Sequence, residues 1–298
     1  MLLDIIVIPT GWYYVGPVIF DEEVARKTWR VLEVCHGMIY FAPEAMEAYA
    51  ELGLSAPQGY FASRSAALGD VAPEVVIATF YNFNPRYVRE SITGVWTKTT
   101  PEAVLAARHG AASKTLSRVF GDTDVTRVAE LLREAATAVA DDFVGRPLYA
   151  AHAALPWPTE PHLVLWHAQT LLREYRGDAH VAALLTAGLS GIDALVTHAA
   201  AGGVAAETLR KSRNWSETEW QQAIESLRAR DWLTDAPDPT FTPTGQSRRE
   251  ALELATDRNA VRPYAHIGLE ACEELQTLGR PLSRAVAEAV MPWALSRT

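Results

Sequence analysis

Residues 215–242, with the sequence WSETEWQQAIESLRARDWLTDAPDPTFT, contain the signals that decide the fold. Ser216 is followed three residues later by Glu219, which is the capping-box pattern found at helix starts. After the helix, two short apolar runs flank the Pro- and Asp-rich segment 235–239, a pattern typical of a β-hairpin. This stretch therefore predicts a helix from Ser216 to about Arg230 and a hairpin over 232–242.

The residues around this stretch complete a winged helix-turn-helix pattern. Helices are predicted at about 179–187, 190–201, 204–212 and 243–257. Ser190 opens the second of these helices, and the pair Gly202-Gly203 gives the turn after it. The order of helix, turn, helix, hairpin and helix is that of a winged helix-turn-helix.

The remaining chain also predicts helices. Asn84-Pro85 and Thr100-Pro101 each place a capping residue before a proline, which is a common helix start. The segment 155–161 has three prolines in seven residues, so we place a boundary between two halves there. The predicted fold class is mainly all-α, with a helical N-terminal half and a winged helix-turn-helix C-terminal half that carries a short β-hairpin wing. The predicted domains are an N-terminal arm at 1–20 with a short strand at Ile5–Ile8, a helical domain at 21–158, and a winged-helix domain with flanking helices at 159–298.

The composition excludes several classes of protein. Of the 298 residues, 49% are hydrophobic and 21% are charged, which excludes a disordered or fibrous chain. Two cysteines, Cys35 and Cys272, are too few for a disulfide scaffold or a Cys-built zinc site. The 27 Lys and Arg against 36 Asp and Glu give a net charge of −9, which argues against a large nucleic-acid interface. No basic residue precedes the first apolar run, and no apolar run reaches the roughly 20 residues of a membrane span, so we expect a cytoplasmic protein with no membrane partner.

Two segments of the C-terminal half resemble MarR-type winged helices. They are LRARDWL at 227–233 and FTPTGQSR at 241–248. In MarR-type proteins a helix ends in a Leu-x-x-x-Gly-Leu phrase and the wing closes with Leu-Thr-x-x-Gly. Asp231 stands here where glycine is usual. The resemblance implies a ligand-responsive, dimeric DNA-binding regulator.

Residues 25–290 resemble, more broadly, an uncharacterised and largely actinobacterial helix-turn-helix family. The phrases that carry this resemblance are YFAPE at 40–44, TFYNFNP at 79–85, GRPL at 145–148, LLREYRGDAH at 171–180 and TDR at 256–258. The resemblance implies a helical N-terminal half and a winged-helix C-terminal half. It implies no settled activity.

The charges of the C-terminal half oppose DNA reading. Between residues 180 and 264, nine Lys and Arg face eleven Asp and Glu, and Glu217, Glu219 and Trp220 occupy the reading end of the predicted recognition helix. Because carboxylates repel phosphate, we expect that this winged helix no longer reads DNA. The alternative is DNA binding through residues 204–242. In that alternative the phosphate contacts come from Arg210, Lys211 and Arg213, and the adenine contacts come from Gln221 and Gln222.

The helix after the proline-rich segment carries the densest set of polar residues. We predict an anion-binding site formed by Arg173 and Arg176, because guanidinium groups suit carboxylate or sulfate, with His167 and His180 beside them. Glu174 is a candidate for proton transfer. The alternative is a network of ion pairs around a tight turn at Gly177, with Asp178 capping the next helix.

A second set of candidate residues lies near the N-terminus. Glu33, His36 and Tyr40 are spaced to share one helix face, so His36 and Tyr40 are candidate acid and base groups. The alternative is a buried structural histidine. Cys35 adjoins His36 but points to another helix face, which predicts a packing role. No metal-ligand spacing and no cofactor motif is found, so neither is predicted.

The function predicted from the sequence is binding of a small polar or anionic organic molecule. Metal-free acid/base catalysis on that molecule, through His36, Tyr40 and Glu174, is an open extension. The alternatives are a MarR-like ligand-responsive regulator that binds DNA, and a winged helix kept as a protein-interaction or homodimerisation module.

Overall fold

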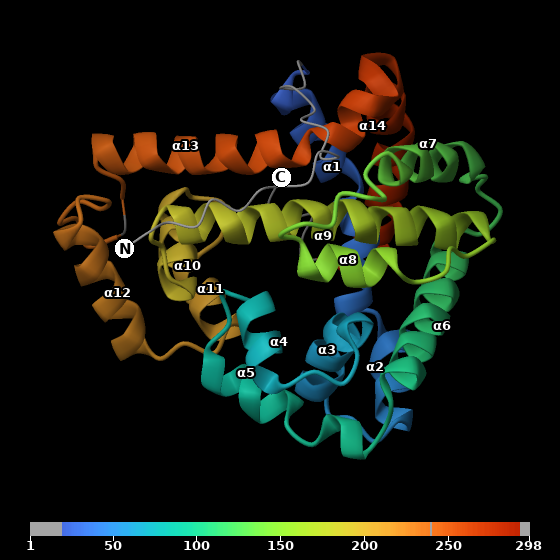
Figure 1. Ribbon diagram of the computed structural model, residues 1–298, viewed down its shortest axis with the longest axis horizontal. Coiled ribbons are helices and arrows are strands. Elements are labelled where there is room, and N and C mark those ends of the chain that lie inside the picture. Colours follow the sequence, from blue (N-terminus) through green and yellow to red (C-terminus); the bar gives the residue numbers. More distant parts are fainter. Residues whose placement is uncertain (1–19, 239, 293–298) are drawn as a thin grey trace, which may run out of the picture.

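The computed structural model describes residues 20–238 and 240–292, and this part of the chain is built almost entirely of helices (Figure 1). The predicted arm and its strand at Ile5–Ile8 lie outside the described residues, apart from Phe20. The helices are α1 (Glu22–Gly37), α2 (Pro43–Glu51), α3 (Ala56–Ser65), α4 (Pro73–Thr79), α5 (Pro85–Ile92), α6 (Pro101–Phe120), α7 (Thr126–Thr137), α8 (Pro147–Ala153), α9 (Pro161–Thr186), α10 (Gly191–Ala200), α11 (Ala206–Ser212), α12 (Glu217–Ala229), α13 (Pro243–Ala260) and α14 (Arg262–Val290). Short 3-10 helices lie at Met38–Tyr40, Ala66–Leu68 and Val95–Thr97.

The helix starts follow the capping signals of the sequence. Asn84 accepts a hydrogen bond from the Arg86 backbone N–H, and Thr100 accepts one from Ala103, each just before a proline at the first helical position. At α12 the capping box is complete, because the Glu219 N–H donates to Ser216 Oγ at 3.2 Å and the Ser216 N–H donates to Glu219 Oε2 at 2.9 Å. The predicted starts of these three helices are confirmed.

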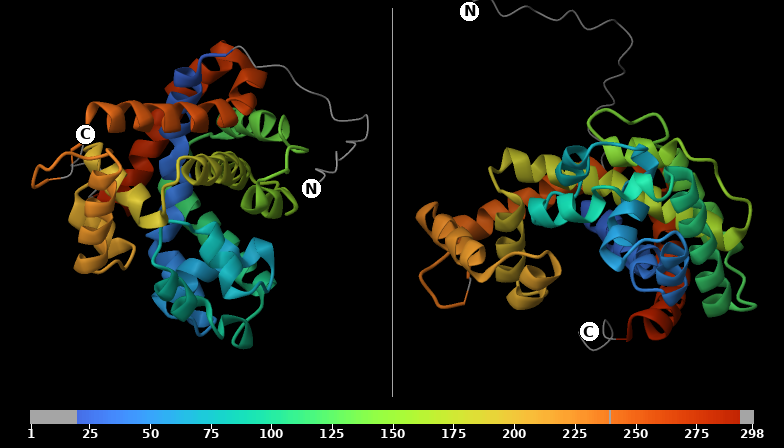
Figure 2. Two further views of the ribbon diagram at one scale, coloured as in Figure 1. Left: turned by 60° about the vertical axis from the view of Figure 1, so that its left-hand side comes forward. Right: turned by 90° about the horizontal axis from the view of Figure 1, so that it is seen from below.

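Helix α9 runs through the centre of the molecule and packs against α1, α6, α7, α8 and α13 (Figures 1 and 2). Its first half is buried on every side, since the eight residues 163–170 are all inaccessible or nearly so. No single described helix is long and apolar enough to cross a membrane, and α9 and α10 meet that test only as a pair bent by 98°.

The described residues form two hydrophobic cores, and the division between them does not fall at the predicted boundary between residues 158 and 159. The proline-rich segment does end α8 and precede α9, but Leu163 and Tyr175 of α9 pack in the same core as the N-terminal helices. Residues 261–291 return to that core, where α14 packs along α1. The second core begins at Leu184 and ends at Leu252. Prolines can end a helix without ending a core, so the break in secondary structure did not mark the division.

The second core belongs to the helix-turn-helix part, which comprises α10, α11 and α12 and lies at one end of the molecule (Figures 1 and 2). After α12, one antiparallel bridge joins Leu233 to Phe241, and the Thr234 N–H donates to Thr240 O at 2.9 Å. The described residues contain no longer strand pairing. The fold is therefore mainly α, as predicted, and the predicted hairpin contains a single bridge between described residues.

The helix predicted at 179–187 is the last part of α9 and does not stand alone. The predicted tight turn at Gly177 is wrong, because α9 continues through it and Gly177 does not have the positive φ of a turn glycine. Asp178 does not cap a following helix either. Its carboxylate accepts a hydrogen bond from the Tyr149 N–H at 2.9 Å, in the first turn of α8.

Candidate functional site

A set of buried and half-buried polar side chains lies where the end of α1 meets α9. We call Glu33, His36, Tyr40, Arg173 and Glu174 the central polar cluster. Arg173 Nε donates to Glu33 Oε1 at 2.6 Å, and its Nη1 donates to Glu174 Oε1 at 3.0 Å. His36 Nε2 lies 2.7 Å from Tyr40 Oη. The structure therefore brings the predicted catalytic residues His36, Tyr40 and Glu174 together with the predicted ligand residue Arg173.

His36 is held as a neutral imidazole in one tautomer. Thr170 Oγ1 donates its hydrogen to Trp166 O at 2.9 Å, so it accepts a hydrogen bond from His36 Nδ1, also at 2.9 Å. Nε2 is then the acceptor for the Tyr40 hydroxyl. Burial, and after it the charge of Arg173, holds the pKa of His36 well below its usual range. His36 is thus a neutral proton acceptor whose lone pair is already used by Tyr40.

The two carboxyl groups of the cluster differ in their tendency to ionise. Burial raises the pKa of Glu33, and its Oε2 has no hydrogen-bond partner among the described residues. For Glu174, burial disfavours the charge, but the guanidinium groups of Arg173 and Arg64 hold its pKa below the usual range. Glu174 is therefore a carboxylate that holds Arg173, and Glu33 is the more readily protonated of the two.

Three further residues border the cluster, and none of them is among the catalytic or ligand residues predicted from the sequence. They are Arg64 of α3, Arg108 of α6 and His152 of α8. Arg108 Nη1 donates to Ser63 O at 2.6 Å, and Arg64 Nη1 donates to Tyr60 Oη at 2.7 Å. Burial, with the charge of Arg108 second, lowers the pKa of His152 to about 3. Arg64 and Arg108 therefore add positive charge beside the cluster, whereas His152 is neutral.

The other three predicted ligand residues lie apart from the cluster, and two of them, Arg176 and His180, contact adjacent residues of α13. Arg176 Nη1 donates to Asp257 Oδ1 of α13 at 2.6 Å. His180 Nδ1 lies 3.0 Å from Thr256 Oγ1. His167 packs edge-on against Trp157, with the ring centroids 4.8 Å apart. Arg173 faces α1, Arg176 and His180 face α13, and His167 faces Trp157. The structure therefore does not bring the four predicted ligand residues together around one point.

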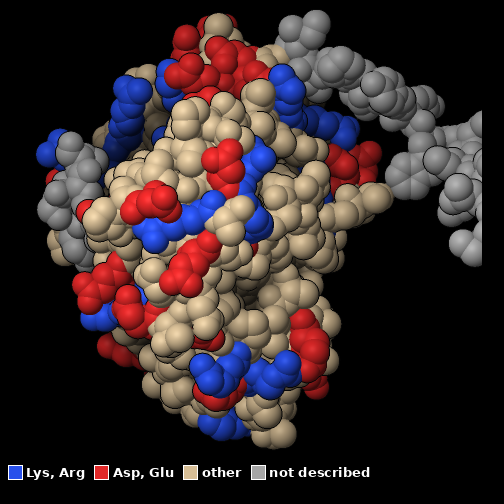
Figure 3. Space-filling view, turned by 90° about the vertical axis from the view of Figure 1, so that its left-hand side faces the viewer, with Lys and Arg blue, Asp and Glu red and all other residues tan. Residues whose placement is uncertain are grey.

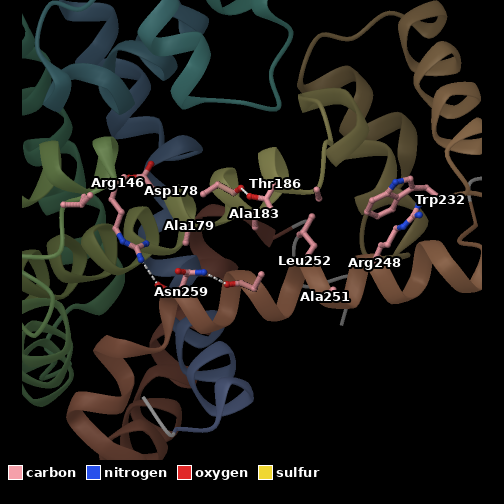
Figure 4. A pocket seen from close by; sticks show the side chains of 15 residues that line it. Arg146, Asp178, Ala179, Ala183, Thr186, Trp232, Arg248, Ala251, Leu252 and Asn259 are labelled. Carbon is pink, nitrogen blue, oxygen red and sulfur yellow. Dashed lines mark hydrogen bonds between the residues drawn. The ribbon is translucent and has the colours of Figure 1, made fainter. Parts of the chain in front are cut away.

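A groove of about 680 Å³ lies between α9 and α13, and we call it the junction groove (Figure 4). Arg146, Asp178 and Asn259 line one end, and Trp232 and Arg248 line the other. The wall between the ends consists mainly of small apolar side chains: Ala179, Ala182, Ala183, Ala187, Ala251, Leu252 and Ala255. None of the catalytic or ligand residues predicted from the sequence lines this groove.

The ends of the junction groove carry charge and hydrogen-bonding groups. Arg146 donates to Asn259 O at 2.8 Å, and Arg248 donates to Arg230 O at 2.9 Å. Burial raises the pKa of Asp178 to about 6, although the Tyr149 N–H opposes the shift. The groove therefore offers an apolar middle with a guanidinium group at each end.

The basic residues predicted to hold DNA are already engaged. Arg210 pairs with Glu217 at 2.8 Å, and Lys211 pairs with Glu207 at 2.6 Å. Arg213 points back toward the helical bundle, with its guanidinium carbon 4.7 Å from the centre of the Phe83 ring. Arg210 and Arg213 are both largely withdrawn from the outer surface, and only Lys211, of these three, is exposed.

The outer face of α12 is polar and acidic. Gln221 and Gln222 are exposed, and so are Glu217 and Glu225. Arg228 is the one basic residue of α12, and it donates to Thr234 O at 2.9 Å. Figure 3 shows acidic and basic side chains interspersed over this end of the molecule, without a broad basic surface. Such a face does not match the phosphate backbone of DNA.

The helix-turn-helix part is docked against the loop between α4 and α5, both at the start of α10 and between α11 and α12. Trp215 Nε1 donates to Asn82 O at 2.9 Å, and the Asn84 N–H donates to Arg213 O at 3.0 Å. Gly191, at the start of α10, lies so close to the Tyr81 carbonyl that an added Cβ would be 2.0 Å from its oxygen. A side chain at this position would push the two parts of the molecule apart.

Neither cysteine has the environment of a nucleophile. Cys35 and Cys272 are fully buried and unpaired, and burial raises the pKa of the Cys35 thiol to about 12. The predicted packing role of Cys35 is confirmed. Across residues 20–238 and 240–292, no group of three His, Cys, Asp or Glu side chains could hold a metal ion.

Comparison with known proteins gives one match. A family model described as a helix-turn-helix family matches residues 25–292. No curated protein and no solved structure matches the chain.

Proposed function

We propose a function from one premise, which is that the chain belongs to the helix-turn-helix family. In this proposal the chain is a small-molecule-binding protein with a winged-helix arrangement in its C-terminal half. Its helix-turn-helix is docked on the helical bundle and does not read DNA in that state. The observation that carries the proposal is the junction groove between α9 and α13.

The size and lining of the junction groove suit an organic molecule. Ligand pockets typically have volumes of roughly 300–1,000 Å³, mostly apolar walls and a few placed polar groups. The groove, at about 680 Å³, falls within this range. Its alanine-rich middle suits an apolar body, and Arg146 and Arg248 suit polar or anionic ends. The proposed ligand is therefore elongated and amphipathic.

The position of the groove links ligand binding to the helix-turn-helix. Trp232 and Leu252 line the groove and also pack in the second core, with α10 and α12. Arg146 lines the same groove and donates to Tyr175 O of the first core at 2.6 Å. A molecule in the groove would touch both parts, and would therefore favour the docked arrangement.

Filling the junction groove is expected to weaken binding of an amphipathic probe. Anilinonaphthalene sulfonate, which has apolar rings and one sulfonate, is expected to bind the wild-type protein saturably. Ala182→Trp places an indole in the groove from its open side and is expected to weaken that binding by about tenfold or more. The measurement is a fluorescence titration of the probe at constant protein concentration.

Leu185→Trp is the matched control for this experiment, because Leu185 is an exposed residue of the same helix that does not line the groove. It is expected to leave the affinity for the probe unchanged. Equal affinities in the wild type and both variants would show that the probe binds elsewhere and would remove the support for a ligand in the groove.

DNA binding is the second candidate function, favoured by family membership and by one structural feature. Thr218, Gln221 and Gln222 are all exposed on the outer face of α12, where a recognition helix presents its reading residues. If the protein binds DNA, release of the helix-turn-helix from the helical bundle would allow Arg213 to contact the phosphate backbone. The acidic side chains on the same face of α12 oppose DNA binding, because they repel phosphate.

We expect no saturable binding of the wild-type protein to duplex DNA at physiological salt. The measurement is fluorescence anisotropy with a labelled duplex library, at low and at physiological salt. Neutralising Glu217 and Glu225 together, as Glu217→Gln and Glu225→Gln, is expected to raise the low-salt affinity, since two repulsive charges are removed. Tight wild-type binding that is lost in Gln221→Ala would establish the regulator function and contradict the first proposal.

A further inference from the structure

The central polar cluster, taken together with the residues that border it, has an excess of positive charge. Three guanidinium groups, those of Arg64, Arg108 and Arg173, face two carboxyl groups. Arg173 accounts for both carboxyl groups, because it donates to Glu33 and to Glu174. Arg64 and Arg108 have hydrogen bonds to the Tyr60 hydroxyl and the Ser63 carbonyl but no ion pair with a carboxylate among the described residues. Buried charges are normally paired, so this arrangement lacks one negative charge.

Several polar atoms of these residues have no partner in the described part of the chain. Arg108 is 3% exposed, and its Nε and Nη2 are both buried without an acceptor. Arg64 Nε is likewise buried and has no acceptor among the described residues. His152 is also 3% exposed, and its Nε2 has no partner. Buried donors and acceptors of this kind are nearly always satisfied in native proteins, so the set points to a bound molecule.

Aromatic rings restrict where an acceptor can approach the two arginines. The Arg108 guanidinium carbon lies 5.1 Å from the centre of the Trp166 ring, and that of Arg64 lies 4.2 Å from the centre of Phe80. Each guanidinium group thus lies over an aromatic ring, which excludes an acceptor from that side. The N–H groups in the plane then remain for an acceptor, and a planar carboxylate fits this in-plane edge best.

His152 requires that the bound molecule also has a hydrogen-bond donor. Its ring hydrogen-bonds to the Arg64 backbone, and because it is neutral it has only one N–H to donate. With Nδ1–H donating to the Arg64 carbonyl, Nε2 is a lone-pair acceptor. It would therefore pair with a hydroxyl or N–H donor on the bound molecule, and not with the carboxylate itself.

We propose that Arg64, Arg108 and His152 bind a small carboxylate that also carries a hydroxyl group. The carboxylate accepts hydrogen bonds from the two guanidinium groups, and the hydroxyl donates to His152 Nε2. This site is separate from the junction groove, because none of the three residues lines the groove. Arg64 is only half-buried, so the site reaches the surface on the side of α3.

The test uses the wild-type chain with nitrogen-15 in its arginine side chains. The Nε–H resonances of Arg64 and Arg108 are assigned from their loss in Arg64→Lys and Arg108→Lys. Lactate, propionate, phosphate and chloride are then titrated separately at constant ionic strength. Lactate and propionate are a matched pair, since they differ only in the hydroxyl group.

Lactate is expected to shift both Nε–H resonances saturably, and to bind about tenfold more tightly than propionate, because only lactate can donate to His152 Nε2. Equal affinity for lactate and propionate would overturn the role of His152. A saturable shift with phosphate alone would overturn the carboxylate class. No saturable shift with any probe would overturn the site.

Two variants separate this site from the groove and from folding defects. His152→Phe keeps a buried ring without an acceptor nitrogen, and it is expected to reduce the preference for lactate over propionate to about one. Ala182→Trp is expected to leave lactate binding unchanged. If Ala182→Trp removed lactate binding together with the amphipathic probe, the two sites would be one and the separate site would be refuted.

Discussion

Replacing Asp257 with asparagine is expected to lower the free energy of unfolding by about 3 kcal/mol, because it removes a buried carboxylate that pairs with two guanidinium groups. Of the two, only Arg176 keeps another carboxylate among the described residues, that of Glu253 at 3.7 Å. The Asp257 carboxylate is 1% exposed and lies between two arginines, Arg26 of α1 and Arg176 of α9. It therefore joins α1, α9 and α13 at one point. For a chain of 298 residues, the corresponding fall in melting temperature is roughly 5 °C.

The matched control for Asp257→Asn is Glu288→Gln, which removes one charge from an exposed ion pair with Arg284. Since such surface pairs contribute about 0–1 kcal/mol, its melting temperature is expected to stay within about 2 °C of the wild type. Thermal unfolding followed by circular dichroism measures both variants. Equal effects of the two substitutions would show that the buried carboxylate does not hold these three helices together.

The helix starts were predictable because their signals are local. Ser216 with Glu219, Asn84 before Pro85 and Thr100 before Pro101 each satisfy backbone N–H groups within a few residues of the cap. Tertiary contacts are not needed to interpret such patterns. The same is not true of Gly177, where packing on several sides of α9 keeps the helix continuous through a residue that often ends helices.

The boundary between the cores was not predictable from the proline-rich segment. Helix α14 follows the helix-turn-helix in sequence but packs along α1, and this contact joins residues about 250 positions apart. Composition and periodicity carry no information on such pairing. A boundary inferred from helix breaks therefore marks where a helix ends, and not where one core gives way to another.

The central polar cluster was partly predictable, for a similar reason. Glu33, His36 and Tyr40 lie one helical turn apart, so their proximity follows from spacing alone. Their contact with Arg173 depends on how α1 meets α9, which spacing does not give. The sequence does contain a pattern that indicates burial of Arg108. This residue lies four positions after Val104 and four before Ala112, on the buried face of α6. A charged residue at such an apolar-face position indicates a buried polar site.

Acidification from pH 6.5 to pH 4 is expected to destabilise the protein steeply. Burial lowers the pKa of His152 to about 3 and those of His167 and His180 to about 4, and it holds the pKa of His36 well below its usual range. In the unfolded chain these groups bind protons below about pH 6.5, whereas in the native state they stay neutral. The unfolded state then binds more protons, so stability falls by roughly 1.4 kcal/mol per pH unit for each group across this window.

Asp178 acts in the opposite direction, because burial raises its pKa to about 6 and the native state binds its proton first as the pH falls. Burial also raises the pKa of Glu33, but two such carboxyl groups do not offset four histidines. Urea unfolding at a series of pH values from 7.5 to 4.5 measures the net slope. His152→Gln is expected to flatten that slope by roughly 1.4 kcal/mol per pH unit, and His109→Gln, at an exposed position, is expected to leave it unchanged. A pH-independent free energy of unfolding between pH 6.5 and 4.5 would show that the buried histidines accept protons in the folded protein as readily as in the unfolded chain.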